Sequence, residues 1–115
     1  MEITAWVKGS YRKYLIGLRT KTEEDIIQLG QQEAAVSMSD YDTVGEFHQE
    51  RGRIKSLTNM KFAYLKRINR RVNEIDQGAF TGKCQCGENI EKKILREYPD
   101  RALCTKCQIE KNGKS

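Results

Sequence analysis

The feature that most constrains this chain is a long stretch with a helical pattern and no helix breaker. Residues 53–77 contain neither glycine nor proline, and at about 1.5 Å per residue such a helix extends roughly 38 Å. Its apolar residues recur at steps of three and four, with Lys61 filling the one gap. They are Ile54, Leu57, Tyr64, Ile68, Val72 and Ile75. Thr43 with Glu46 three residues later forms a capping box, and Gly78 is typical of a C-terminal cap, so the sequence predicts a helix between them.

A second helical stripe precedes this one. Its members follow one another at steps of three or four: Leu15, Leu18, Thr22, Ile26, Leu29, Glu33 and Val36. This spacing predicts one helix from about residue 8 to residue 37. Thr22 followed by Asp25 also resembles a helix start, so a second interpretation breaks the helix near residues 20–22.

A short polar segment joins the two stripes. Residues 37–42 read Ser-Met-Ser-Asp-Tyr-Asp, which suits a turn. Two apolar stripes joined by a short turn make an antiparallel helical hairpin of the coiled-coil type, with Asp40 and Asp42 at its tip.

These elements predict a mainly α fold. We expect the N-terminal helices and the hairpin over residues 1–78, with a tip at about 37–43, and a small cysteine-bearing module with a C-terminal helix over residues 79–115. The module must pack near the base of the hairpin, and the aromatic residues that precede the hairpin are expected to cover it as core. These are Trp6, Tyr11 and Tyr14.

Composition limits the size of the core. A chain of 115 residues has room for one domain. Its hydrophobic fraction of 37% lies below the roughly 45–50% of an average globular chain, so burial alone supplies little stability. Such a chain folds if its apolar residues line a narrow helical seam, or if a metal or disulfides add to it.

The net charge of +5 is unevenly distributed. Residues 1–50 hold five Lys or Arg and nine Asp or Glu, residues 51–82 hold eight and two, and residues 83–115 hold eight and five. An acidic front and a basic middle indicate a partner surface recognised by charge, either nucleic acid or an enzyme that handles it. The alternative is a solvated helix face.

Four cysteines form two close pairs. Cys84 and Cys86 are separated by 17 residues from Cys104 and Cys107. Four thiolates at about 2.3 Å complete the tetrahedral shell of Zn²⁺, which makes the expected zinc structural. The first pair is C-x-C, a tighter loop than the common C-x-x-C, and two disulfides or free thiols remain the alternatives.

Around these cysteines the chain resembles the DksA/TraR family of four-cysteine zinc-finger proteins. The matching residues are Ile75-Asp76-Gln77-Gly78-Ala79-Phe80, then Cys86-Gly87-Glu88-Asn89-Ile90, then Pro99, then Cys104-Thr105-Lys106-Cys107-Gln108. The resemblance covers roughly residues 64–108. It departs from the family at the tip, where Asp40, Asp42 and Glu46 replace the D-x-x-D-x-A pattern of fully active members.

The lack of a signal-peptide pattern and the four clustered cysteines predict a cytoplasmic protein. The resemblance implies a transcription regulator that binds RNA polymerase and no DNA sequence of its own. Family members insert a helical hairpin into the secondary channel of the enzyme and modulate initiation, often together with guanosine tetraphosphate. By this resemblance the acidic tip would reach the active centre. From its charge we expect the basic face, with Arg67, Arg70 and Arg71, to meet acidic walls of the channel. We expect a monomer with one structural zinc.

Two other functions are compatible with the cysteines. C-x-C followed by C-x-x-C also resembles the zinc-thiolate pairs of a redox-regulated chaperone, in which oxidation releases the metal. A nucleic-acid-binding finger is the other, with basic residues for phosphate contacts. Those residues are Lys83, Lys92, Lys93, Arg96, Arg101 and Lys106, joined by Lys66, Arg67, Arg70 and Arg71.

Catalysis and membrane insertion find no support in the sequence. The chain has no nucleophile, base and acid set, no glycine loop that cradles phosphate, and a single histidine, His48, which we expect to be an exposed polar residue. No stretch approaches the roughly 20 apolar residues that span a bilayer. We therefore predict a protein that is not an enzyme and has no membrane partner.

Overall fold

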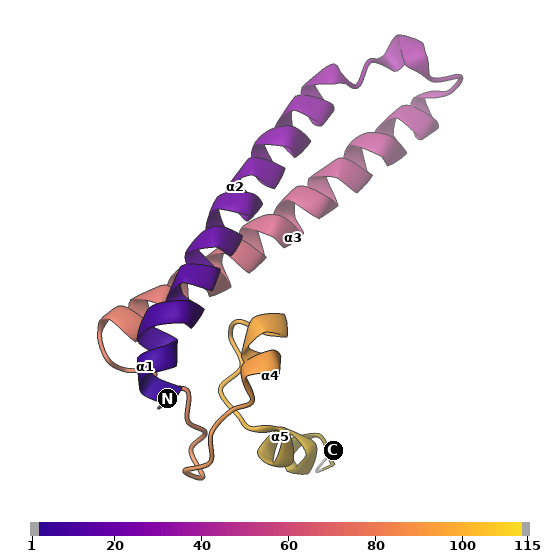
Figure 1. The fold of residues 1–115 in the computed structure, drawn as a ribbon. Helices are drawn as coiled ribbons and strands as arrows, with labels where there is room; N and C mark the ends of the chain where they lie inside the picture. The colour runs from indigo at the N-terminus through magenta and orange to yellow at the C-terminus, as the bar shows by residue number, and fades with distance from the viewer. Residues whose placement is uncertain (1–2, 114–115) are drawn as a thin grey trace. The chain divides into compact units, whose positions relative to one another are not determined.

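The computed structural model describes residues 3–113 and is mainly helical (Figure 1). In chain order the elements are α1 (Ile3–Trp6), the π-helical turn η1 (Val7–Tyr11), α2 (Arg12–Ala35), the 3₁₀ turn η2 (Met38–Asp40), α3 (Val44–Asp76), α4 (Lys92–Glu97) and α5 (Thr105–Gly113). These residues form no strand, only one isolated antiparallel bridge, between Lys83 and Asn89. None of their helices is long and apolar enough to cross a membrane.

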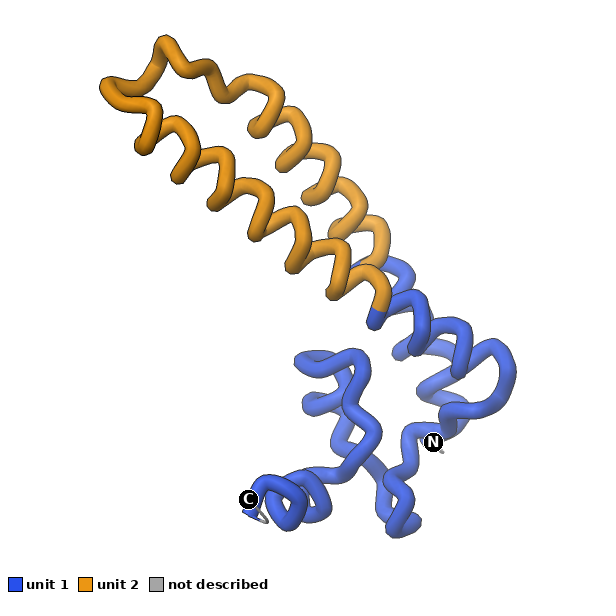
Figure 2. The backbone as a smooth tube through the Cα atoms, turned by 180° about the vertical axis from the view of Figure 1, so that it is seen from behind, with its two compact units in different colours: residues 1–18, 67–115 blue, residues 19–66 orange. Residues whose placement is uncertain are grey.

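The chain divides into two compact units (Figure 2). Unit 1 comprises residues 1–18 and 67–115, and unit 2 comprises residues 19–66. Unit 2 holds the hairpin turn, and unit 1 holds the four-cysteine module with the adjoining ends of the two long helices. The boundary predicted at residue 78, between the hairpin and the cysteine module, stays a prediction.

Unit 2 is an antiparallel pair of helices, as the two stripes predict (Figure 1). Leu29 and Ile54 are buried in its seam, and so is Thr22, which is only 4% exposed. Helix α2 continues through Thr22 without interruption, so the interpretation that breaks the helix near residues 20–22 is wrong. The side chain of Thr22 is small enough to lie between the two helices. Because α2 does not start at this residue, Thr22 does not have to serve as an N-cap.

Polar pairs fill the places where the apolar stripes are interrupted. Lys61 donates from Nζ to Oδ2 of Asp25 at 3.0 Å, and Lys21 donates to Oδ1 of the same carboxylate at 2.7 Å. Farther along the seam, Glu33 lies 3.6 Å from the guanidinium of Arg51. Lys61 interrupts one stripe and Glu33 the other, and each pairs with an opposite charge on the facing helix, Asp25 and Arg51 respectively, which favours one register of the hairpin.

The start of α3 is the one predicted. The backbone N–H of Glu46 donates to Oγ1 of Thr43 at 3.1 Å. One of the N–H groups that have no partner within a helix is thereby satisfied.

The end of α3 is also the one predicted. The N–H of Ala79 donates to the carbonyl of Glu74 at 2.8 Å, and that of Gly78 to the carbonyl of Ile75 at 3.1 Å. With Gly78 at a φ of +74°, these bonds form a Schellman cap.

Unit 1 begins with helical turns that start earlier than predicted, at Ile3 instead of about residue 8. The π-helical turn brings Trp6 and Tyr11 together, five residues apart, with their rings stacked at 5.2 Å between centroids and 13° between planes. Both are buried, as expected for core. Tyr14 is not core, because its side chain is 38% exposed and its hydroxyl donates to the carbonyl of Arg96.

The core of unit 1 joins the long helices to the module. Its buried apolar members are Trp6, Val7, Tyr11, Leu15, Ile68, Val72, Ile75, Phe80, Ile90 and Leu95. The hydroxyl of Tyr11 extends this packing, because it shares its one proton between the carbonyls of Leu95 and Pro99, each at 3.1 Å. The cysteine module thus rests on α1, η1 and the adjoining ends of α2 and α3.

Candidate metal centre

The first cysteine pair lies in a tight turn. The N–H of Gly87 donates to the carbonyl of Cys84 at 2.9 Å, and the N–H of Cys84 donates to the carbonyl of Glu88 at 2.8 Å. Gly87 has a φ of +91°, a conformation that is open to glycine and strained for other residues. The chain therefore reverses within four residues, and the C-x-C spacing suffices to bring Cys86 beside Cys84.

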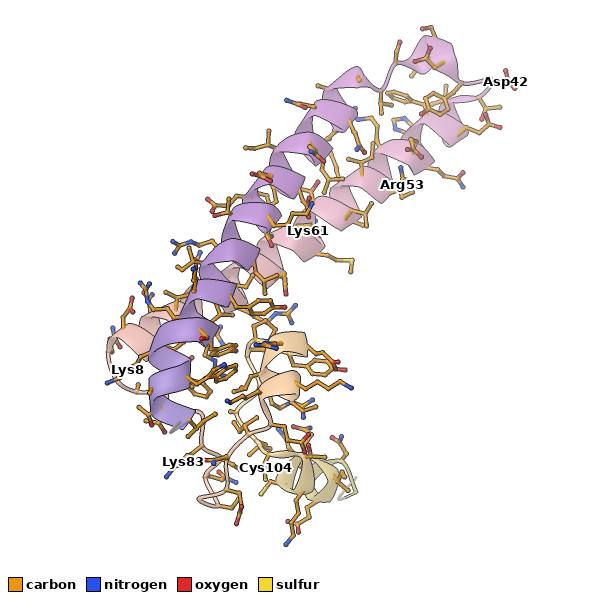
Figure 3. All side chains as sticks on the ribbon, viewed as in Figure 1. Lys8, Asp42, Arg53, Lys61, Lys83 and Cys104 are labelled. Carbon is orange, nitrogen blue, oxygen red and sulfur yellow. The ribbon has the colours of Figure 1, made fainter. Side chains whose placement is uncertain are left out.

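The second pair lies at the start of α5. Cys104 immediately precedes this helix, and its carbonyl accepts the N–H of Gln108 at 2.9 Å. Cys107 is in the first helical turn, one turn along from Cys104. The unpaired N–H groups at a helix start favour negative charge, which suits thiolate ligands. Figure 3 labels Cys104 at this end of α5.

The four sulfur atoms lie at the distances that a tetrahedral zinc site requires. All four Sγ atoms lie within 4.8 Å of one another, and those of Cys86 and Cys104 are 3.7 Å apart. Four ligands at about 2.3 Å from a tetrahedral metal lie roughly 3.8 Å from one another, whereas a disulfide joins its sulfurs at about 2.05 Å. The four cysteines are free thiols, so the geometry fits a metal ion.

The electrostatics of the cluster oppose four thiolates without a cation. Hydrogen bonds from the backbone N–H groups of Cys86 and Cys104 lower the pKa of the Cys84 thiol to about 6. The neighbouring thiols, that of Cys84 first, raise the pKa of Cys107 above its ordinary value. One cysteine therefore loses its proton readily, and its negative charge then disfavours deprotonation of the neighbouring thiols. A divalent cation removes this repulsion and deprotonates its ligands.

A side-chain hydrogen bond also links the segments that bear the two pairs. Oγ1 of Thr105 donates to Oε1 of Glu91 at 3.1 Å, which links the start of α5 to the segment after the first pair. Cys84 and Cys104 are buried, Cys107 is half-buried and Cys86 is exposed. A metal in this cluster would have one side shielded by protein and one side open to solvent.

The predicted tip residues are exposed at the turn of unit 2. Asp40 ends η2, Asp42 lies in the following turn and Glu46 is in the first turn of α3, all with exposed side chains. Figure 3 labels Asp42 there. The rings of Tyr41 and Phe47, in the same turn, meet edge to face at 6.1 Å between centroids.

The predicted basic face is smaller than expected. Arg67 and Arg70 are exposed on α3, whereas Arg71 is buried, with 3% of its surface exposed. The side chain of Arg71 donates to the carbonyls of Pro99 and Arg101. The assignment of Arg71 to an exposed partner-binding face is therefore wrong, because its guanidinium is used inside unit 1.

Comparison with known proteins relates this fold to a transcription factor. No protein-family model matches the chain. A relative described as an uncharacterized protein of Aquifex aeolicus (strain VF5) is 29% identical over 77 residues, covering 66% of this chain and 52% of that protein. The chain thus spans about half the length of this relative.

A solved structure, that of the transcription factor DksA2 from Pseudomonas aeruginosa, matches with a TM-score of 0.83. The two share 18% sequence identity, and the match covers 97% of this chain and 88% of the other. At this identity the likeness establishes the fold. The predicted hairpin with a four-cysteine module is confirmed, and so is the resemblance to the DksA/TraR family in fold and in the clustered cysteines.

Proposed function

We propose that this protein is a DksA-like transcription regulator that binds RNA polymerase. The observation that carries the proposal is the fold, which matches that of a DksA2 transcription factor over 97% of the chain. Fold alone does not determine function, so the site residues have to support the proposal as well. The same fold gives no support to an enzymatic role.

The metal centre supports the proposal, because the four-cysteine cluster has the ligand set of a structural site. Cys84, Cys86, Cys104 and Cys107 would hold one Zn²⁺ with no open coordination position. The metal would supply folding energy to a module that has few apolar residues of its own. It takes no part in a reaction.

The acidic tip supports a mechanism that acts through the secondary channel of the polymerase. A two-helix hairpin is narrow enough to enter a protein channel, and the exposed carboxylates of Asp40, Asp42 and Glu46 stand at its turn. In the polymerase these groups would act where metal ions and phosphates are handled and so alter initiation. Arg67 and Arg70 would contribute to docking by charge. The protein would act in the cytoplasm as a monomer.

The experiment is transcription in vitro from a ribosomal-RNA promoter, with and without guanosine tetraphosphate. The lanes contain no factor, the wild type, Asp40→Asn/Asp42→Asn, or the control Glu23→Gln/Glu24→Gln, which neutralises two exposed acids elsewhere in unit 2. We expect the wild type and the control to change transcript yield and the tip variant to lose most of that change. Binding to core polymerase should persist in the tip variant.

Two results would contradict the proposal. The proposed function would lose its support if transcript yields were equal in all lanes and the protein did not compete with another factor that binds the secondary channel. Tight, sequence-selective binding to DNA would instead favour the nucleic-acid-binding finger.

A further inference from the structure

Arg71 is a buried cation whose contacts all lie within unit 1. Its Nε donates to the carbonyl of Pro99 and its Nη2 to the carbonyl of Arg101, each at 2.8 Å. The guanidinium also lies 3.6 Å from the ring centroid of Phe80 and 3.7 Å from the carboxylate of Glu74. Burial of the guanidinium is compensated because its planar fork hydrogen-bonds two carbonyls and its face stacks on a ring.

These contacts reach both segments that lead to the cysteines. Phe80 is four residues before Cys84, and Arg101 is three residues before Cys104. The second segment, residues 98–104, has no regular helix or strand. Its path therefore depends on a turn between Tyr98 and Arg101 and on what its carbonyls bond.

The hydroxyl of Tyr11 reinforces the same point of the backbone. It donates to the carbonyl of Pro99 at 3.1 Å, so this oxygen accepts from Tyr11 and from Arg71 together. One residue comes from the N-terminal helical turns and the other from α3. The backbone before the second cysteine pair is thus held from two helices by buried hydrogen bonds.

We propose that Arg71 is a positioning residue for the metal centre. It holds the backbone before the second cysteine pair by two hydrogen bonds and stacks on the side chain of Phe80 before the first pair, and so sets the distance between the pairs. The inference rests on the proposed metal ligation and adds to it a residue that touches no sulfur. By linkage the coupling is reciprocal: metal binding holds residues 98–104 against Arg71, and loss of Arg71 weakens the metal.

The test compares metal affinity and metal geometry in three variants of the full chain. Arg71→Met removes the fork and keeps much of the volume. Arg70→Met removes an exposed arginine from the adjacent position, and Val72→Ala removes buried apolar volume from the same helical turn. Zinc affinity is measured by competition with a chelator, and Co²⁺ serves as a spectroscopic probe, because the intensity of its absorption bands reports tetrahedral geometry.

We expect Arg71→Met to bind zinc at least ~10-fold more weakly, within the usual range of coupling between sites, and to show an altered Co²⁺ spectrum. Arg70→Met should resemble the wild type in both measurements. Val72→Ala is expected to lower stability and to weaken zinc binding only as far as metal binding and folding are linked. Its Co²⁺ spectrum should stay that of the wild type.

If Arg71→Met does not fold, Arg71→Lys and Tyr11→Phe replace it. The lysine keeps the charge but cannot donate in a fork, and the phenylalanine keeps the stacked ring but gives up the bond to Pro99. Each should bind zinc more weakly than the wild type and show an altered Co²⁺ spectrum.

Three results decide the matter. A changed Co²⁺ spectrum together with an affinity loss larger than that of Val72→Ala supports the positioning role. A wild-type Co²⁺ spectrum, together with a loss of zinc affinity no larger than that of Val72→Ala, overturns the positioning role and leaves the proposed metal centre intact. A wild-type protein that takes up neither zinc nor Co²⁺ overturns the metal centre itself and this role with it.

Discussion

At the scale of single residues, Gly82 is the described glycine with the least room for a side chain. It has a φ of +85°, and a Cβ built on it would lie 2.7 Å from Cγ1 of Ile3 and 3.0 Å from Cγ2 of Val7. Gly82→Ala therefore adds backbone strain to a steric clash, and we expect it to lower the free energy of unfolding by about 2–4 kcal/mol.

The matched control is Gly78→Ala. Gly78 has a similar φ of +74° but open space around its Cβ position, so only the backbone term applies, about 1 kcal/mol. Urea unfolding followed by circular dichroism measures both variants. Equal losses of stability in the two variants would show that the contacts of residue 82 with Ile3 of α1 and Val7 of η1 add no cost.

The cysteines give the second prediction at this scale. Cys107→Ser should reduce zinc in the purified protein from one per chain to near zero, because three thiolates and a hydroxyl form a much weaker site. The fluorescence of Trp6 should change as well, since this ring stacks on Tyr11 and lies 5.1 Å from the ammonium of Lys92 in α4. Metal analysis is the primary measurement, and Ser56→Ala, an exposed change on α3, is the control. Wild-type protein purified without chelator that holds less than half a zinc per chain would contradict the prediction.

The four-cysteine cluster is predictable from sequence because its chemistry is local. In a reducing compartment, two close cysteine pairs at this spacing favour a metal site over disulfides. Arg71 is different, because its neighbour Arg70 is exposed and nothing in the helical pattern separates the two. Its partners lie 28 and 30 residues away in the chain, at Pro99 and Arg101. No local pattern encodes carbonyls at that separation.

At the scale of helices, the start of α3 depends on one side chain. Thr43→Ala removes the oxygen that accepts the N–H of Glu46, and loss of such a cap costs about 1 kcal/mol. The free energy of unfolding, from urea titration, should fall by that amount. Ser56→Ala, inside the same helix and exposed, should be neutral or slightly stabilising because alanine is the better helix former. A Thr43→Ala protein as stable as the wild type would mean that water caps the helix equally well.

The ion pairs of the hairpin seam predict a pH dependence. Hydrogen bonds from Lys21 and Lys61 lower the pKa of Asp25 below its ordinary value. A lowered pKa means that the charged form is favoured in the folded state, so the stabilisation is present above an unfolded pKa of about 3.9 and is lost as pH falls through the lower folded value. The stability difference between the wild type and Asp25→Asn should therefore be constant from about pH 7 to pH 5 and shrink below about pH 4.

Thermal unfolding at several pH values measures this difference. Glu24→Gln, an exposed change beside Asp25 on α2, serves as the control. A difference that is the same at pH 3 as at pH 7 would show that the carboxylate of Asp25 contributes no charge-dependent stability.

The helices were predictable where side chains repeat along one face and where caps mark the ends. The stripe through Ile54 and Ile68, Thr43 at its start and Gly78 at its end all agree with the structure. The π-helical turn at residues 7–11 was not predictable, because it is set by the stacking of Trp6 on Tyr11 within a folded core. Helix α4 has only six residues, too few for a periodic pattern.

At the scale of the whole molecule, the fold was predictable because two independent patterns agree on it. The helical stripes predict a hairpin, and the cysteine spacing predicts a small four-cysteine module. The residues that would recognise a partner are less predictable, because exposure depends on packing between distant segments. Arg67 and Arg70 remain exposed, and they are the residues on which a charge-dependent interaction with polymerase can be tested.

Charge reversal of these two arginines is the last prediction. Arg67→Glu/Arg70→Glu should weaken binding to RNA polymerase core enzyme by ~10-fold or more at 0.1 M salt, where the Debye length is about 10 Å. The loss should shrink as salt is raised, because the same charges are then screened.

The tip variant Asp40→Asn/Asp42→Asn should show the opposite separation, with binding kept and regulation lost. Lys8→Glu/Lys13→Glu changes the net charge by the same amount at exposed positions, so net charge alone is the cause if both reversals weaken binding equally. A loss specific to residues 67 and 70 that disappears at high salt would instead locate the docking surface on α3.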